Sequence, residues 1–186
     1  TGNSDVIDYV TIASTGNAQD FGDASAAKNY VSGLASATRA VIGGGNSGSN
    51  LDVMEYVTIG STGNVTDFGN LVAATQMLSA CAGSTRGLFG GGIPSSASNV
   101  IQYITIASTG NTTDFGDLTA ARYALTATAN KTQGLFLNGR EAGENYYIDT
   151  IESVTIASTG NATDFGNGVE GRRFSAATSS AHGGIA

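Results

Sequence analysis

The chain repeats one ten-residue sequence four times, and we call this sequence the phrase. Four aspartates lie at matching places in its copies, and their type and spacing could support metal binding. Each is followed three residues later by a second Asp or Asn, giving the pairs Asp20/Asp23, Asp67/Asn70, Asp114/Asp117 and Asp164/Asn167. Ca²⁺ prefers such oxygens, but a calcium site needs about six to eight of them converging, and each pair offers few. We therefore expect no bound metal, and expect the four leading aspartates, Asp20, Asp67, Asp114 and Asp164, to cap N–H groups of their own turns.

The Asp-Phe-Gly tripeptides in these phrases resemble a magnesium-binding motif of protein kinases. The tripeptide occurs four times, however, and the chain has no glycine-rich ATP loop, β3-type lysine or HRD motif. A kinase is therefore excluded. The four phenylalanines are interpreted as packing residues between repeats, and they are Phe21, Phe68, Phe115 and Phe165.

Other reactive side chains are sparse. His182 is the only histidine, and the only cysteine, Cys81, is interpreted as a small buried hydrophobe. Two carboxylates of the set Glu141, Glu144, Glu152 and Glu170 could serve a glycosidase, which keeps a polysaccharide hydrolase as an alternative. Solvated loop charges explain the same residues equally well, so we expect no enzymatic activity and no cofactor.

The elements that must position these residues are set by the repeated phrase. Its copies read STGNAQDFGD, STGNVTDFGN, STGNTTDFGD and STGNATDFGN, and they begin at Ser14, Ser61, Ser108 and Ser158, which are 47, 47 and 50 residues apart. A β-branched apolar run precedes each copy. Periods of this length are typical of stacked or radial repeats, so we expect a single domain over residues 1–186.

Composition favours an all-β chain. Charged residues make up 12% and there are 27 glycines, which suits many short strands and tight turns. Eight basic residues against fifteen acidic ones, without a basic run, disfavour nucleic acid as a partner. No apolar run is long enough for a bilayer, so no membrane insertion is expected.

Within one period the sequence predicts four strands. In the second copy they cover residues 52–59, 65–68, 73–81 and 86–90, with the Ser-Thr-Gly-Asn turn between the first two. Gly63 and Asn64 accept positive φ at little cost, as a turn requires. Four strands in about 45 to 50 residues is what one propeller blade needs.

The order of residues within a period resembles the kelch repeat. The third copy shows Phe89-Gly90-Gly91, then Tyr103, Phe115 and Arg122. The phenylalanines of the phrase stand where a kelch repeat has Trp, Thr75 replaces the basic residue, and Ser153 replaces the tyrosine. The wording around the phrase, as in VTIASTGNATDFG from Val154, is similar to repeats in tail-fibre-like and virion structural proteins of marine bacteriophages, including cyanophages.

The resemblance implies a β-propeller of four kelch-like, four-stranded blades. Aligned by the phrase, Thr1 falls just after a glycine pair and Ala186 near the start of a fourth strand, so the two ends together supply most of one blade. We expect closure by pairing of N- and C-terminal strands, which removes an open sheet edge. An excerpt of a larger propeller is the alternative.

Function is expected in the loops, because repeated strands fix a scaffold while unlike loops carry recognition. The linker from Arg140 to Tyr147 differs most from its counterparts, and we call it the individual loop. Its candidate binding residues are Arg140, Glu141, Glu144, Tyr146 and Tyr147. The resemblance implies a non-enzymatic module of a virion or extracellular assembly, with other virion or surface-assembly proteins as partners. A lectin-like module that binds host-surface glycans is the first alternative to this assembly role.

Overall fold

The chain forms only strands, turns and loops in the part that the computed structural model describes, which is residues 2–141, 143 and 147–179. Fifteen strands make four antiparallel sheets, and no helix occurs among these residues. The β-branched run before each phrase forms one strand of each sheet, as such side chains favour. The predicted all-β class is confirmed.

Each copy of the phrase lies in its own sheet, and we number the sheets by that copy. Sheet 1 contains β1 (Ser4–Tyr9) and β2 (Gln19–Lys28). Sheet 2 contains β3 (Ser32–Ala35), β4 (Arg39–Gly43), β5 (Val53–Thr58) and β6 (Thr66–Asn70). Sheet 3 contains β7 (Ser79–Ala82), β8 (Arg86–Gly90), β9 (Ser98–Thr105), β10 (Thr113–Tyr123) and, at its edge beside β10, β13 (Arg140–Glu141). Sheet 4 contains β11 (Thr126–Ala129), β12 (Gln133–Leu137), β14 (Thr150–Thr155) and β15 (Thr163–Asn167).

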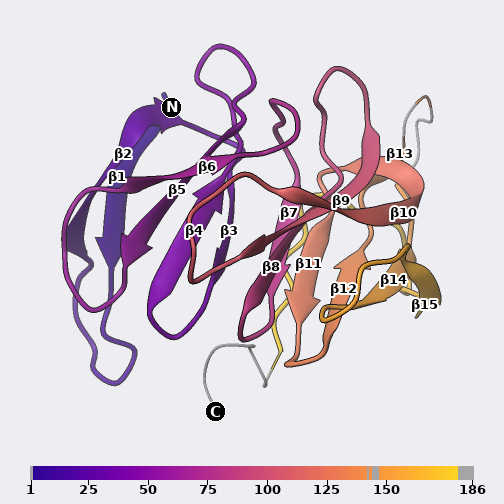
Figure 1. The fold of residues 1–186 in the computed structure, drawn as a ribbon. Coiled ribbons are helices and arrows are strands. Elements are labelled where there is room, and N and C mark those ends of the chain that lie inside the picture. Colours follow the sequence, from indigo (N-terminus) through magenta and orange to yellow (C-terminus); the bar gives the residue numbers. More distant parts are fainter. Residues whose placement is uncertain (1, 142, 144–146, 180–186) are drawn as a thin grey trace.

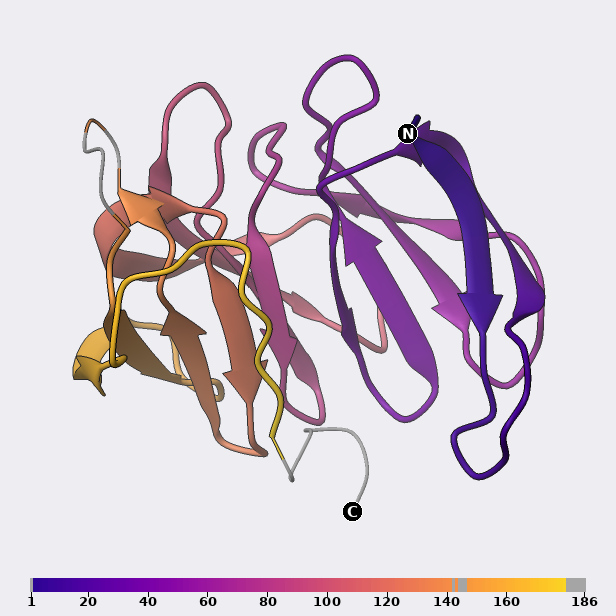
Figure 2. The same ribbon diagram turned by 180° about the vertical axis from the view of Figure 1, so that it is seen from behind.

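The sheets follow one another in chain order along a curled row (Figure 1). Strand β7 contacts β3 on one side and β11 on the other, so the first strands of sheets 2, 3 and 4 lie together. Sheet 1 and strand β15 lie at opposite ends of the row in both Figure 1 and Figure 2. The phrase turns project at one end of the sheets, and the linkers after β4 and β8 project at the other (Figure 1).

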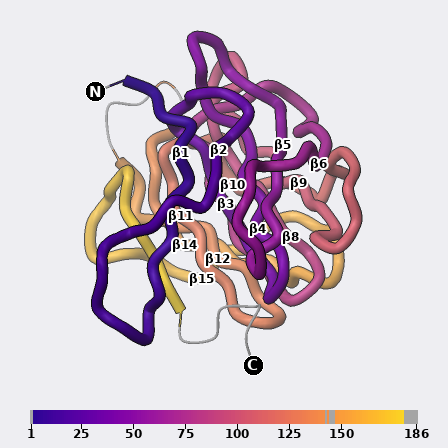
Figure 3. The backbone as a smooth tube through the Cα atoms, turned by 90° about the vertical axis from the view of Figure 1, so that its left-hand side faces the viewer, coloured from indigo at the N-terminus to yellow at the C-terminus, as the bar shows by residue number. Residues whose placement is uncertain are grey.

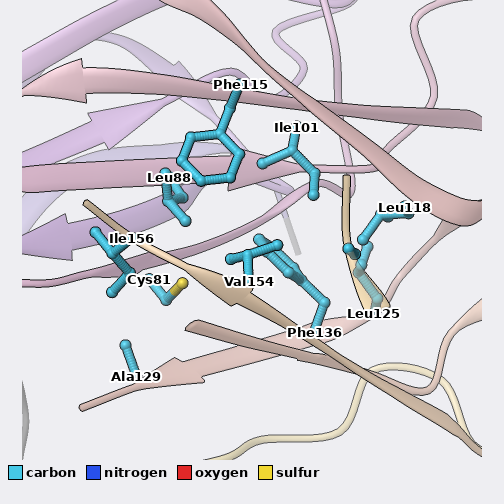
Figure 4. Close-up of a cluster of buried hydrophobic side chains, with 11 residues drawn as sticks. Cys81, Leu88, Ile101, Phe115, Leu118, Leu125, Ala129, Phe136, Val154 and Ile156 are labelled. Carbon is cyan, nitrogen blue, oxygen red and sulfur yellow. The ribbon is translucent and has the colours of Figure 1, made fainter. Parts of the chain in front are cut away.

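Two apolar cores fill the spaces between consecutive sheets. The core between sheets 2 and 3 includes Met54, Phe68 and Phe89. The core between sheets 3 and 4 includes Leu88, Phe115 and Phe136, with Cys81 and Val154 beside them (Figure 4). Sheet packing of this kind is face to face, so sheets 2, 3 and 4 depend on one another for burial.

The predicted third strand is shorter than expected. Residues 73–78 do not belong to a strand, and β7 begins only at Ser79. Met77 has a φ of 55°, in the left-handed region, and this turns the chain just before the strand. Tyr30, Ala124 and Phe174 hold the matching places in the other repeats, with φ values of 53°, 52° and 52°. The other three strands of that copy agree with the prediction to within two residues.

The C-terminal segment returns along the first strands of the sheets. The N–H of Phe174 donates to Ala124 O at 2.9 Å, as the N–H of Ala124 does to Met77 O at 3.0 Å. The ring of Phe174 also stacks on Tyr30 at 6.4 Å between centroids. Seen along the row from sheet 1, this yellow segment lies on one side and β5, β6 and β9 on the other (Figure 3). The predicted pairing of the last residues with the N-terminal strands falls on residues 180–186, outside the described part.

Candidate binding sites

Each phrase has two halves, the Ser-Thr-Gly-Asn turn and the Asp-Phe-Gly strand, and in the second and third copies the two halves contact different neighbouring sheets. The Ser-Thr-Gly-Asn turn of one copy binds the Asp-Phe-Gly strand of the copy before it, through the main chain. The donor and acceptor pairs are Gly63 N to Phe21 O, Gly110 N to Phe68 O and Gly160 N to Phe115 O, each 2.7 Å. We call each of these contacts a junction, and each joins two consecutive sheets.

A side-chain cap completes every junction. The Oδ1 atom of Asn64 accepts the N–H of Asp23 at 3.1 Å, and the Asn111 and Asn161 side chains do the same for Asn70 and Asp117, each at 3.0 Å. The turn asparagine of the next repeat therefore provides this cap. Our prediction placed such caps on Asp20, Asp67, Asp114 and Asp164, but in the described part of the chain these four are exposed and accept no hydrogen bond.

The junction requires glycine on the strand side. A Cβ atom on Gly69 or Gly116 would lie 2.4 Å from the carbonyl oxygen of Gly110 or Gly160. Their φ values of 137° and 145° also disfavour any side chain. This close main-chain approach accounts for the glycine after Phe in the first three copies of the phrase.

Charged side chains are buried at two of the three junctions. Lys28 Nζ lies 2.5 Å from Glu55, and Arg122 lies 3.0 Å from Glu152, with both members of each pair almost inaccessible to solvent. At the middle junction the matching positions hold Thr75 and Gln102, which are both neutral. Burial lowers the pKa of Arg122, while the neighbouring negative charge of Glu152 opposes that shift.

The same carboxylates hold the chain that follows the phrase. Glu55 accepts the N–H of Ser25, and Glu152 accepts both the N–H and the hydroxyl of Thr119. At the middle junction, where the side chain is neutral, Gln102 accepts the N–H of Val72. The position therefore needs an acceptor that reaches back to the preceding repeat, whatever its charge.

Three of the four phrase phenylalanines are buried, and Phe68 and Phe115 belong to the two apolar cores. Phe21, Phe68 and Phe115 are buried, and Tyr9, Tyr56 and Tyr103 meet them edge to face at 5.9 to 6.1 Å. Phe165, in contrast, is 58% exposed. It lies on β15, the last strand of the row.

Shallow polar hollows accompany three of the phrase turns. Their volumes are about 130, 170 and 250 Å³ at the turns beginning at Ser14, Ser108 and Ser158. Each is lined by the hydroxyls and amide of one Ser-Thr-Gly-Asn turn and by the end of the preceding strand. Tyr9 and Tyr103 add an aromatic wall in two cases, and Ser153 takes that place in the third.

The individual loop between β12 and β14 is described only in part. Arg140 and Glu141 form β13, Arg140 bridges to Tyr147, and the Arg140 guanidinium lies 6.0 Å from the ring of Tyr123. Tyr147 is exposed, with the Arg173 guanidinium 5.3 Å from its ring centroid. Glu144 and Tyr146 lie outside the described residues.

The remaining carboxylates, the cysteine and the histidine lie in separate parts of the chain. Glu152 is fully buried in its ion pair, and Glu170 pairs with Arg172 at the surface. Cys81 is buried in the core between sheets 3 and 4 as predicted, and burial raises the pKa of its thiol to about 12. His182 is outside the described part, within which no group of three or more His, Cys, Asp or Glu is placed to hold a metal ion.

The junction was not predicted, although the sequence contains a signal for it. Lys28 and Arg122 precede an acidic residue at the same place in the next repeat, and neutral Thr75 precedes neutral Gln102. Comparison with protein-family models and with curated proteins finds no match to this chain. In the described part there is also no helix that could cross a membrane.

Proposed function

We propose that this chain is a non-enzymatic module of a virion appendage or surface assembly, built as a β-propeller with one kelch-like blade for each phrase. The observation that carries the proposal is the junction made three times, which fixes consecutive sheets to one another by the same backbone contacts. A scaffold held in this way leaves its linkers free to differ and to bind partners.

The arrangement of the sheets supports blades over other all-β designs. Their first strands lie together and their cores lie between consecutive sheets, as in radial arrays. The separation of sheet 1 from β15 favours an arc of a larger propeller over a closed ring of four blades (Figure 1).

The linkers offer a binding edge at the end of the sheets opposite the phrase turns. Asn50 Nδ2 donates to Ile93 O at 2.7 Å and to Pro94 O at 2.9 Å, which ties the linker after β4 to the linker after β8. Fixed neighbouring linkers lose little conformational freedom on binding a partner protein, so they favour assembly.

Gold-labelled antibody against this chain tests the assembly role. Applied to purified phage particles that encode the chain, the label is expected on the tail or another external appendage. Label confined to infected cells and absent from finished particles would contradict a virion role.

Glycan binding is the second candidate, favoured by the three matching hollows at the phrase turns. Each displays several hydroxyl and amide groups, which suit the hydroxyls of a sugar, and repeated weak sites gain strength together on a glycan-covered surface. Thr15→Val, Thr109→Val and Thr159→Val each remove one hydroxyl from one hollow. Binding to a glycan array is expected to fall stepwise as these are combined.

The control for that experiment is Tyr147→Ala in the individual loop. Loss of glycan binding in this variant, with the threonine variants unaffected, would move the glycan site from the hollows to the loop. No binding of the unchanged protein to any glycan on the array would contradict the candidate.

A further inference from the structure

The two ends of the row carry the unpaired halves of a fourth junction. Among the described residues the Gly16 N–H of the first turn, Ser14–Asn17, makes no hydrogen bond, whereas Gly63, Gly110 and Gly160 at the same place each donate to the preceding sheet. The strand β15 carries the other half, and nothing lies within 4 Å of a Cβ on Gly166. Gly166 nevertheless keeps a φ of 142°, close to the 145° of Gly116 in a formed junction.

Apolar side chains are exposed at both unpaired halves. Ile12 is 98% exposed, whereas at the same place in the later repeats Ile59 is 44% exposed and Ile106 and Ile156 are buried. Phe165 is exposed on β15, whereas Phe115 is buried beneath the next turn. Removing these side chains from water would favour contact with the matching half.

The charges at the unpaired halves are complementary. Asp8 holds the place of Glu55 and Glu152, and Arg172 holds the place of Lys28 and Arg122. Arg172 is also positioned like Arg122, because its carbonyl accepts the N–H of Gly139 at 2.8 Å as that of Arg122 accepts Gly92 at 2.9 Å. Within the described residues, its side chain pairs with Glu170 alone, at the surface.

We propose that sheet 1 of one copy of this chain binds strand β15 of a second copy, head to tail, through a fourth junction. In it Gly16 N–H donates to Phe165 O, Asn17 caps the N–H of Asn167, and Asp8 pairs with Arg172. We name a second copy as the occupant because sheet 1 and β15 lie at opposite ends of the row, and each of them carries the half that the other lacks (Figure 1, Figure 2).

This inference rests on the proposed assembly role and names a partner for it. A head-to-tail contact closes into a ring or extends into a fibre, depending on the rotation between copies. Other proteins of the assembly could bind the linkers without using this contact.

Charge reversal with mixing tests the inference. Asp8→Arg and Arg172→Glu each place like charges at the fourth junction, which should raise the apparent dissociation constant for self-association at least about tenfold in sedimentation experiments. An equal mixture of the two variants should associate again. Each junction in the mixture then contains either the original Asp8–Arg172 pair or its reversal.

The mixture separates contact between copies from closure within one chain. A double variant carrying both reversals should behave like the unchanged protein. If the unchanged protein is a monomer, and each single variant loses thermal stability that the double variant regains, the junction closes within one chain, which overturns the inference. A monomer at all concentrations, with partner proteins still bound, would also overturn it while leaving the proposed assembly role standing.

Two further variants guard against effects on folding. Asp5→Arg makes the same charge change on the same strand, at a position whose counterpart Asp52 bonds to Asn70 of its own repeat, and should leave association unchanged. Gly166→Ala should weaken association while the circular dichroism spectrum stays native, because a Cβ there has free space until a second copy binds. Native association of Gly166→Ala would argue against the proposed contact.

Discussion

At the scale of single residues, the chain places charges where most proteins place apolar side chains. Arg122 and Glu152 are buried together, and Arg122 also donates to Asn138 O and Thr150 O. A buried pair of this kind adds little net stability compared with an apolar pair, but losing one partner leaves a buried charge alone. Removal of one member is therefore expected to cost more stability than the whole pair contributes.

Replacing Arg122 by Met should destabilise the protein by about 3–5 kcal/mol, because Glu152 is left charged and buried. Urea unfolding followed by circular dichroism measures the change. The matched control is Arg172→Met at the same place in repeat 4, where the side chain is 58% exposed and little effect is expected. Equal losses of unfolding free energy in the two variants would contradict the expected cost of leaving Glu152 buried without its partner.

Cys81 should not react with a thiol reagent at pH 8 in the folded protein, and should react at once in denaturant. Its raised pKa of about 12, against an ordinary 9.0, keeps the folded thiol protonated. The folded state thus holds a proton that the unfolded state releases, so this contribution to stability is present below pH 9 and is lost as the pH rises towards 12. Rapid native labelling by Ellman's reagent would contradict the burial of Cys81.

At the scale of elements, the phrase is a connector whose two halves bind different neighbours. The sequence was enough to predict strands and their approximate limits, because β-branched runs and turn residues act locally. It could not predict the late start of β7, which depends on the bond from Met77 N to Tyr30 O in the preceding repeat. The predicted cap was also wrong. Local turn chemistry favours capping by Asp20, whereas in the structure Asn64 of the next repeat caps the N–H of Asp23.

Gly116→Ala should cost more stability than Gly166→Ala, by about 1–3 kcal/mol. Both glycines have nearly the same positive φ, so the conformational penalty is shared, but only at Gly116 would the Cβ meet a backbone oxygen, 2.4 Å away. Thermal or urea unfolding at low protein concentration measures the difference. Equal losses of stability in the two variants would show that the junction has room for a Cβ at position 116.

At the scale of the whole molecule, one contact repeated three times curves four sheets into a row. The number of repeats and the fold class could be predicted from the sequence because the phrase recurs at a fixed period. The shape of the row could not, because the angle between sheets depends on the side chains packed between them, such as Phe89 and Phe136. The expected pairing of the two ends stays a prediction, because it depends on residues 180–186, which lie outside the described part.

Amide hydrogen exchange at four glycines tests the junction most directly. Gly16, Gly63, Gly110 and Gly160 have the same neighbours in the sequence, so their intrinsic exchange rates match. In a dilute solution, where copies do not associate, the account predicts slow exchange at Gly63, Gly110 and Gly160, whose N–H groups bind the preceding sheet, and fast exchange at Gly16. Equal rates at all four glycines would contradict the junction and with it the connection between consecutive sheets.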